Sequence, residues 1–253
     1  MRKFVFIVLV GLMLLSAVSA SGYHIYTEIV EKSQFFDEAG SLTGSSVEIV
    51  NEIRRRLDDT TEIEIKQWAD AYNTLMVKDD AILFSASLTE ERKDLFKWAG
   101  PILRKTWSFF VRKDSGIVIH SMEDAKALKR MGTITEDARE QYLLLNGFQN
   151  TVGETDYLRN VQKLHDGEVD AIIESPVSFY ANCVRGGLNP DDFQEAFVVR
   201  ETDLYIAFSK NFPEAVYLNW RNTLEGMYED GTFETIYRKW YPDTTLPVFT
   251  IVE

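Results

Sequence analysis

Apolar runs with the period of a strand alternate along the chain with runs that have the period of a helix. The segment 46–57 shows the helical pattern, with Val47, Val50, Ile53 and Leu57 on one face. Strands are predicted at HIYTEIV (24–30), IEIKQW (63–68), DAILFS (80–85), WSFFVRK (107–113), KRMGTIT (129–135), VDAIIE (169–174) and LYIAFS (204–209). Further helices are predicted at 72–77, 136–145, 158–165, 176–184 and between 216 and 240. This alternation indicates an α/β protein with largely parallel sheets.

The first twenty residues break the pattern. A short basic start is followed by an almost wholly apolar run from Phe4 to Val18, and then by the small residues Val18-Ser19-Ala20. This arrangement predicts a secretory signal peptide over residues 1–20, with an uncleaved anchor as the alternative. The mature chain is therefore expected in the periplasm. No cysteine follows the signal, so a lipoprotein is not expected, and the single cysteine, Cys183, allows no intramolecular disulfide.

The charge balance of the chain is strongly acidic. There are 27 lysine and arginine residues against 40 aspartate and glutamate residues, for a formal net charge of −13. Removal of the signal peptide makes this charge two units more negative, because Arg2 and Lys3 are lost. Nucleic acids and anionic membranes attract basic patches, so neither is an expected partner.

The sequence carries no recognisable catalytic motif. It has no G-x-S-x-G elbow, nucleotide-binding glycine loop or H-E-x-x-H segment. Its three histidines, His24, His120 and His165, are too far apart in sequence to suggest a metal site. Carboxylates are plentiful, which leaves an acid–base pair open, but nothing in the sequence singles one out. We therefore predict no catalytic residue, no cofactor and no metal.

Polar side chains gather where one buried strand gives way to a helix, in FSASLTEER (84–92). Ser87 and Glu90 have the spacing of a capping box, and Thr89 is another candidate N-cap. Neither explains Arg92, whose positive charge in a first helical turn opposes the helix dipole. An anion opposite Arg92 would explain it, with the hydroxyls of Ser85 and Ser87 as further ligands. The alternative is a solvated Arg92 paired with a nearby acid.

The longer segment DAILFSASLTEERKDLFKWAGP (80–101) resembles the pattern D-x6-S-x-T-x2-R…F…P of the extracellular solute-binding proteins, family 3. These are the receptors that deliver polar amino acids and similar solutes to ABC importers. Other segments resemble the family in the same order, namely LTGSSVEIVNEI (42–53), NVQKLHDGEVDAIIES (160–175), and DLYIAFSKN (203–211) with LEGMYEDGTFETIYRKWY (224–241). The resemblance covers nearly the whole mature chain.

The resemblance implies a two-lobed periplasmic binding protein-like (type II) fold with two crossover strands. Residues 22–108 and 204–253 would form lobe 1, and residues 109–203 would form lobe 2. It also implies a binding receptor in place of an enzyme, with a small-molecule ligand, the permease of an ABC importer as partner, and a monomeric state. In such receptors the residue matching Arg92 binds the carboxylate of the ligand, and residues matching Ser85 and Ser87 add hydrogen bonds.

The second lobe departs from the family pattern. The glycine turn that usually binds the carboxylate is replaced by Thr135-Glu136-Asp137-Ala138-Arg139, where Thr135 is expected to cap the helix and face the cleft. Arg139 either offsets the acids of this turn or, as the favoured interpretation, is a solvated helix residue. The aspartate that usually binds the amine aligns near Ser175. Glu174 is the candidate to replace it, unless the amine contact is missing.

Two aromatic residues complete the candidate site. The family's aromatic lid has no clear counterpart, and Trp68 and Tyr72 are the candidates to line the cleft instead. Two other functions stay open on the same fold. One is an enzyme resembling cyclohexadienyl dehydratases, with Glu174 or Asp137 as its acid, and the other is the sensing module of a signalling protein.

Overall fold

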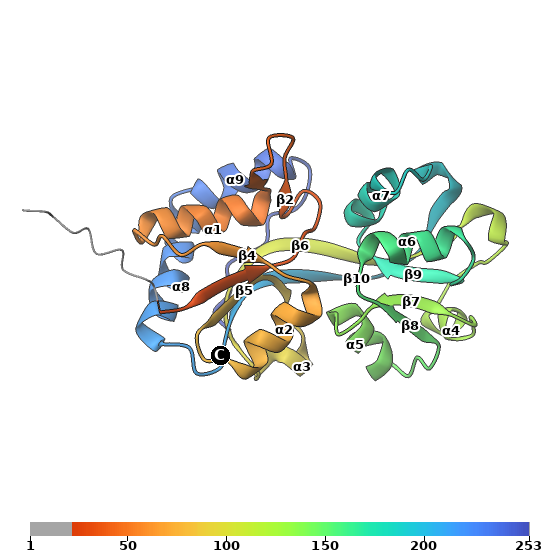
Figure 1. The fold of residues 1–253 in the computed structure, drawn as a ribbon, viewed down its shortest axis with the longest axis horizontal. Coiled ribbons are helices and arrows are strands. Elements are labelled where there is room, and N and C mark those ends of the chain that lie inside the picture. Colours follow the sequence, from red (N-terminus) through yellow and green to blue (C-terminus); the bar gives the residue numbers. More distant parts are fainter. Residues whose placement is uncertain (1–21, 253) are drawn as a thin grey trace, which may run out of the picture.

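Two long antiparallel strands run through the whole molecule. The computed structural model describes residues 22–252, so the predicted signal peptide lies outside the described residues. The two strands are β6 (Lys97–Arg112) and β10 (Phe193–Phe208), and a separate lobe is built around each end of the pair (Figure 1). The predicted two-lobed α/β fold with two crossover strands is thereby confirmed.

One mixed sheet of eight strands extends across both lobes in the order β4-β1-β5-β10-β6-β9-β7-β8. Within each lobe the pairs β1–β4, β1–β5, β7–β8 and β7–β9 are parallel, and the long strands add antiparallel pairs. The shorter strands are β1 (His24–Thr27), β4 (Ile63–Ile65), β5 (Ala81–Ser87), β7 (Met131–Ile134), β8 (Thr151–Glu154) and β9 (Ala171–Glu174). A hairpin of β2 (Phe35–Phe36) and β3 (Leu42–Thr43) stands apart from this sheet.

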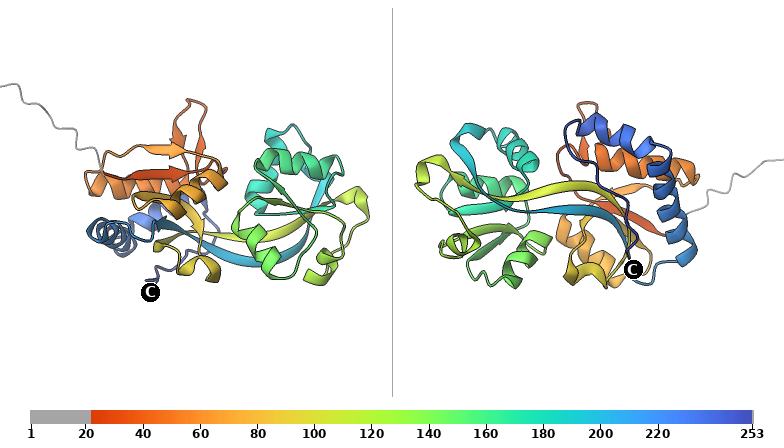
Figure 2. Two further views of the ribbon diagram at one scale, coloured as in Figure 1. Left: turned by 60° about the horizontal axis from the view of Figure 1, so that its bottom comes forward. Right: turned by 180° about the vertical axis from the view of Figure 1, so that it is seen from behind.

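Helices pack against the sheet in both lobes (Figures 1 and 2). The first lobe contains α1 (Ser45–Arg56), α2 (Trp68–Val77), α3 (Glu90–Lys93), α8 (Glu214–Glu229) and α9 (Thr232–Trp240). The second lobe contains α4 (Met122–Lys126), α5 (Ala138–Leu145), α6 (Tyr157–His165) and α7 (Pro176–Arg185). The predicted lobe boundaries at 108 and 204 stay a prediction, since both positions fall inside the long strands.

The burial of strand β5 on both faces explains why its sequence is continuously apolar. Its residues Ala81, Ile82, Leu83 and Phe84 are all buried. Ile82 and Phe84 pack into the core under α1, α8 and α9, whereas Ala81 and Leu83 pack into the aromatic core beside α2. A strand covered on both faces needs an apolar side chain at every position. Where this strand emerges from the core, its polar residues Ser85 and Ser87 lie between the lobes.

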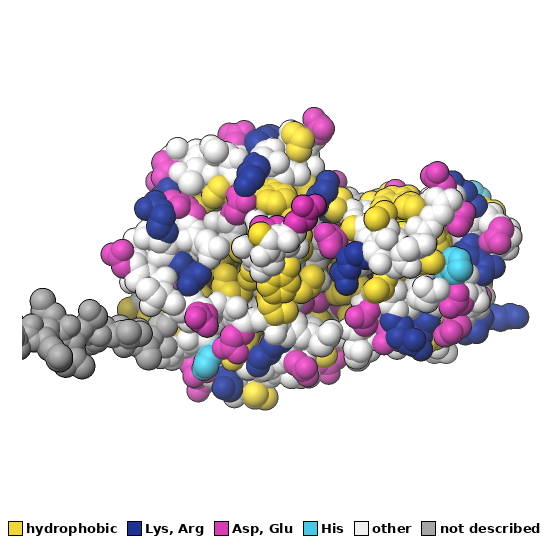
Figure 3. Space-filling view, turned by 45° about the horizontal axis from the view of Figure 1, so that its top comes forward, with side chains coloured by type: hydrophobic (Ala, Val, Ile, Leu, Met, Phe, Trp, Pro, Cys, Tyr) yellow, Lys and Arg dark blue, Asp and Glu magenta, His cyan; other side chains and the backbone are white. Residues whose placement is uncertain are grey.

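The single cysteine of the chain lies in a hydrophobic core. Cys183 packs in the core of the second lobe, and burial raises the pKa of its thiol to about 11. Among residues 22–252, no helix is both long and apolar enough to cross a bilayer. On the face shown in Figure 3, acidic and basic side chains are interspersed around a central group of hydrophobic side chains.

Candidate functional site

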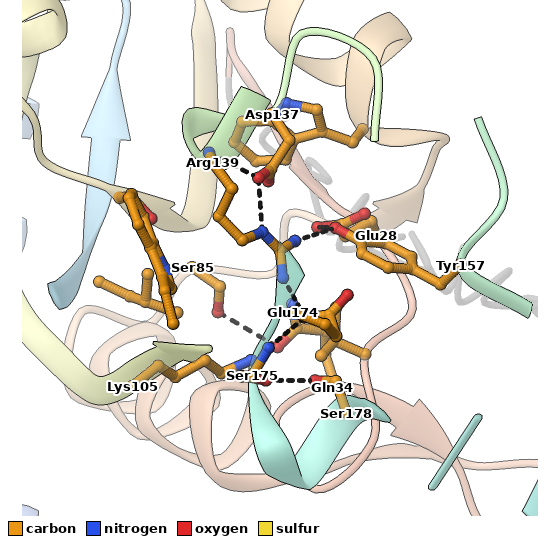
Figure 4. Close-up of a pocket in the computed structure, with 15 residues that line it drawn as sticks. Glu28, Gln34, Ser85, Lys105, Asp137, Arg139, Tyr157, Glu174, Ser175 and Ser178 are labelled. Carbon is orange, nitrogen blue, oxygen red and sulfur yellow. Dashed lines mark hydrogen bonds and ion pairs between the residues drawn. The ribbon is translucent and has the colours of Figure 1, made fainter. Parts of the chain in front are cut away.

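Side chains from both lobes and from the long strands line a small cavity at the lobe interface (Figure 4). Its volume of about 40 Å³ is room for roughly three water molecules. The first lobe contributes Glu28, Val30, Gln34, Trp68, Ser85 and Ser87; the long strands contribute Lys105, Trp107 and Leu204; and the second lobe contributes Asp137, Arg139, Tyr157, Glu174, Ser175 and Ser178. A wider groove of about 790 Å³ shares the lining residues Glu28 and Tyr157 with this cavity.

Arg139 stands at the centre of the charged groups in the cavity. Its Nε donates to Asp137 Oδ1 at 2.6 Å, its Nη1 donates to Glu174 Oε1, and its Nη2 donates to Tyr157 Oη at 3.1 Å. Arg139, Asp137 and Glu174 are all buried. Burial opposes ionisation of Asp137, but the charge of Arg139 outweighs it and lowers the pKa of Asp137. The favoured interpretation of Arg139 as a solvated residue is therefore wrong.

The backbone explains how α5 presents this arginine. Asp137 is the N-cap of α5, and its side chain accepts the backbone N–H of Arg139 at 2.8 Å. A carboxylate at this position satisfies a free N–H and interacts favourably with the helix dipole. Thr135 does not cap the helix as expected; it follows β7, and its backbone N–H donates to Glu154 O. Asp137 therefore accepts two hydrogen bonds from Arg139, one from its backbone N–H and one from its guanidinium Nε.

Glu174 ends strand β9 and already has partners. In addition to Arg139, its Oε1 accepts the backbone N–H of Ser175 at 2.7 Å. The Ser175 hydroxyl donates to Ser178 Oγ at 2.9 Å. The acid that the sequence offers as an amine ligand is thus neutralised by an arginine of the same chain.

Two titratable side chains of the cavity are less fully paired. Glu28 accepts one hydrogen bond, from Tyr157 Oη at 3.1 Å, and burial followed by the nearby Asp137 raises the pKa of its carboxyl to about 8. Lys105, on β6, makes no ion pair or side-chain hydrogen bond within residues 22–252, and burial lowers the pKa of its ammonium to about 8. The cavity can therefore pair with an anionic group through Lys105, and with a cationic group once Glu28 gives up its proton.

The raised pKa of Glu28 predicts a dependence of stability on pH. Between about pH 4.5 and pH 8 the folded protein holds the Glu28 proton more tightly than the unfolded chain, so stability falls as pH rises through this window. The groups that act on this carboxyl are Asp137, Arg139, Tyr157 and Lys105. In Glu28→Gln the side-chain oxygen that accepts from Tyr157 is kept and this loss disappears. Urea unfolding of both proteins across this window should show that the free energy of unfolding falls more steeply with pH for the wild type than for Glu28→Gln. Equal pH dependence of the two proteins would contradict the assignment.

The structure brings five of the eight predicted site residues together. Ser85, Ser87, Trp68, Glu174 and Ser175 all line the cavity. Ser85 adopts a left-handed backbone conformation with φ of 65°, and its hydroxyl donates to Gln34 Oε1 at 3.1 Å. The remaining three, Arg92, Tyr72 and Thr135, are not among the residues that line it.

Arg92 lies behind the cavity, packed against the second lobe. Only 1% of it is exposed, and its Nε donates to Gln141 Oε1 while its Nη2 donates to Glu136 O, both at 2.9 Å. Its guanidinium carbon lies 4.6 Å from the Tyr72 ring centroid and 5.2 Å from that of Trp68. The short helix α3 that carries Arg92 has Thr89 as N-cap, with no side-chain capping bond, so the predicted Ser87–Glu90 capping box does not form.

Sequence reasoning missed several residues of the cavity. Glu28 directly follows strand β1, and the carboxyl end of a parallel strand is a signal that could have identified it. Tyr157 opens α6 without any such signal, and Lys105 lies inside β6, which carries no local mark of a site. Among the described residues, no cluster of histidine, cysteine and acidic side chains has a geometry suited to a metal ion.

The chain belongs to the bacterial extracellular solute-binding proteins, family 3, whose family model matches residues 27–243. A probable amino-acid ABC transporter-binding protein of Haemophilus influenzae is 25% identical over 218 residues, covering 82% of this chain and 79% of that protein. The amino-acid-binding protein AabA of Dichelobacter nodosus is 24% identical over 230 residues, covering 87% of each chain.

Solved structures share the fold at lower identity. Holo ArgBP from T. maritima has a TM-score of 0.70 and 19% identity, covering 87% of this chain and 96% of that one. A histidine kinase sensor domain similar to periplasmic binding proteins has a TM-score of 0.77 and 17% identity, covering 86% and 95%. These likenesses show the fold, and the ligand has to be argued from the cavity.

Proposed function

We propose that the protein is an extracytoplasmic receptor that binds a small polar solute, carboxylate-bearing and amino acid-like, between its two lobes. The solute would then be delivered to the membrane permease of an ABC importer. The observation that carries this proposal is the charged cavity between the lobes, where Lys105 has no ion-pair partner and Glu28 has one hydrogen bond. One relative is named an amino-acid-binding protein and the other a probable amino-acid ABC transporter-binding protein, and both names support the same solute class.

The contacts of the solute follow from which groups are still available. A carboxylate would pair with Lys105 and accept hydrogen bonds from the hydroxyls of Ser85 and Ser87, because an anion is buried favourably only where it is paired. A cationic group would pair with ionised Glu28. Glu174 and Ser175 would shape the same wall, and Trp68 would cover it. The role first expected of Arg92 in holding the carboxylate passes, in this proposal, to Lys105.

A solute can enter only if the lobes separate. A cavity of about 40 Å³ is far smaller than the roughly 300–1,000 Å³ of ordinary ligand pockets. The two long strands join the lobes without helices between them and provide a hinge (Figure 2). We therefore place binding in an open form and the deep contacts in a closed one, as in hinged receptors generally.

Thermal unfolding of the mature protein with panels of amino acids, polyamines, small carboxylates and short peptides tests the proposal. A solute at 100 times its dissociation constant should stabilise the protein by about 2.7 kcal/mol. We expect amino acids to do so, and we expect Lys105→Met to remove the effect while the surface variant Lys239→Met keeps it. Stabilisation by no member of the panels, or equally well by solutes without a carboxylate, would contradict the proposal.

The geometry supports a receptor better than a dehydratase-like enzyme. An acid catalyst has to hold a proton to donate, yet Arg139 lowers the pKa of Asp137, and the Glu174 carboxyl already accepts hydrogen bonds from Arg139 and from the backbone N–H of Ser175. Neither acid is therefore suited to protonate a departing hydroxyl. Turnover of a prephenate-like substrate by the purified protein would overturn this preference.

A further inference from the structure

The carbonyl oxygen of Glu136 joins the two lobes directly. It accepts hydrogen bonds from Trp68 Nε1 and Arg92 Nη2, both at 2.9 Å and both from the first lobe. It also accepts one from Gln141 Nε2 of its own lobe at 3.2 Å. The Glu136 side chain adds a bond from Asn73 Nδ2 at 2.8 Å, and Gln141 Oε1 accepts from Arg92 Nε. We call this group of five residues the Glu136 latch.

Arg92 is the part of the latch with the most to lose on opening. Its guanidinium is charged at any ordinary pH and is buried against the rings of Tyr72 and Trp68. A buried charge is tolerated where it is hydrogen-bonded, and hydrogen bonds from a charged donor are stronger than neutral ones. Both acceptors of Arg92, Glu136 O and Gln141 Oε1, belong to the second lobe. Its hydrogen bonds exist only when the lobes are together.

The backbone of Glu136 is shaped for this contact. Its φ of 61° lies in the left-handed region, which is unfavourable for a residue with a Cβ. Its N–H is held by Glu140 Oε2 at 2.8 Å. Strain of this kind persists only where surrounding contacts over-determine it.

The latch is separate from the solute cavity. Of its members, only Trp68 lines the cavity; Asn73, Arg92, Glu136 and Gln141 do not. The lobes are also bridged inside the cavity by the hydrogen bond from Tyr157 Oη to Glu28 Oε1, which a bound solute could replace. The bonds that Asn73 and Arg92 make to Glu136 and Gln141 lie outside the cavity, so they support closure without involving a solute.

We infer that Arg92 is a positioning residue that holds the lobes closed through Glu136 and Gln141, and that it does not bind the solute. A protein that closes on itself has to open before a solute can enter, so its apparent affinity is reduced by the fraction of molecules that are open. The part of the inference that concerns affinity rests on the proposed function. The part that concerns closure does not.

Small-angle X-ray scattering of the solute-free mature protein tests closure. We expect Arg92→Ala and Gln141→Ala to increase the radius of gyration over that of the wild type. Glu136→Gly is the matched control, because it keeps the carbonyl acceptor, suits the positive φ and removes only the bond to Asn73, so a smaller increase is expected. Gln141→Ala changes a residue of the second lobe and leaves Arg92 in place. It therefore provides the comparison where Arg92→Ala folds poorly. An unchanged radius in both variants overturns the inference.

Calorimetric titration with L-arginine and L-glutamine separates the two roles of Arg92. If Arg92 acts through closure, the alanine variant binds the preferred probe at least as tightly as the wild type, with an expected gain of about threefold or more. If Arg92 binds the carboxylate, the variant loses tenfold or more in affinity and keeps its radius of gyration, which overturns the inference. Should neither amino acid bind, the proposed function is in question, and the scattering result alone decides on the latch.

Discussion

Replacing Arg139 with alanine is expected to lower the free energy of unfolding by about 3–5 kcal/mol. The guanidinium bonds two buried carboxylates, Asp137 and Glu174, and its removal leaves both without their cationic partner. Breaking a buried ion pair costs far more than the pair itself contributes, because an uncompensated charge stays in a medium that solvates it poorly. Urea unfolding at pH 7 measures the loss.

A matched surface substitution calibrates this result. Arg55 also donates to a carboxylate, that of Glu52, but it is exposed, and Arg55→Ala should leave the free energy of unfolding almost unchanged. The response to acid provides a second check. In the wild type Arg139 lowers the pKa of Asp137, so the stability it confers is present at neutral pH and is lost as pH falls through the folded pKa. In mild acid the free energy of unfolding of Arg139→Ala should therefore come closer to that of the wild type. A cost below about 1 kcal/mol would mean that water solvates these carboxylates.

The second large effect is expected from Gly44→Ala, at about 2–5 kcal/mol of lost stability. Gly44 precedes α1 with φ of 119°, a conformation that side chains rarely adopt. A Cβ there would lie 2.5 Å from both the carbonyl carbon and the oxygen of Ser33, and 2.9 Å from the nitrogen of Gln34. These are backbone atoms that cannot rotate away, so the segment that carries Gln34 to the cavity would have to shift.

Gly40→Ala separates the two causes of this loss. Gly40 also has a positive φ, of 78°, but an added Cβ there would meet nothing within 4 Å. Its substitution should therefore show only the conformational cost, about 1–2 kcal/mol. The difference between the two variants in urea unfolding measures the clash at Gly44. Equal losses would show that the Ser33–Gln34 segment moves aside freely.

The sequence predicted the elements whose signal is local. Strand β5 and helix α1 were found because burial on two faces, or on one, leaves a pattern in consecutive residues. The full length of β6 was not found. Its first ten residues precede the expected start at Trp107, and they form a strand because they pair with β10. The short elements β8 and α4 were missed because four or five residues are too few to show a period.

The site divides in the same way. Ser85 and Ser87 were predicted because a strand end places them, and the structure puts both at the cavity. Arg139 was misinterpreted because its partner Glu174 comes from a distant strand. Arg92 matches a family motif, yet the conformation of Glu136, a residue of the other lobe, determines what it touches. Partners brought together by tertiary structure leave no trace in the local sequence.

The path of the chain through the two long strands has a consequence for the order of folding. The chain leaves the first lobe along β6 and returns along β10, which lies between β5 and β6 in the sheet. Residues such as Ile206 and Phe208, which complete the first core, are therefore made only after the whole second lobe. Pairing of distant segments closes a long loop and is intrinsically slow, whereas the second lobe is a continuous stretch. The second lobe can fold first, and the first lobe stays incomplete until nearly the last helix has been made.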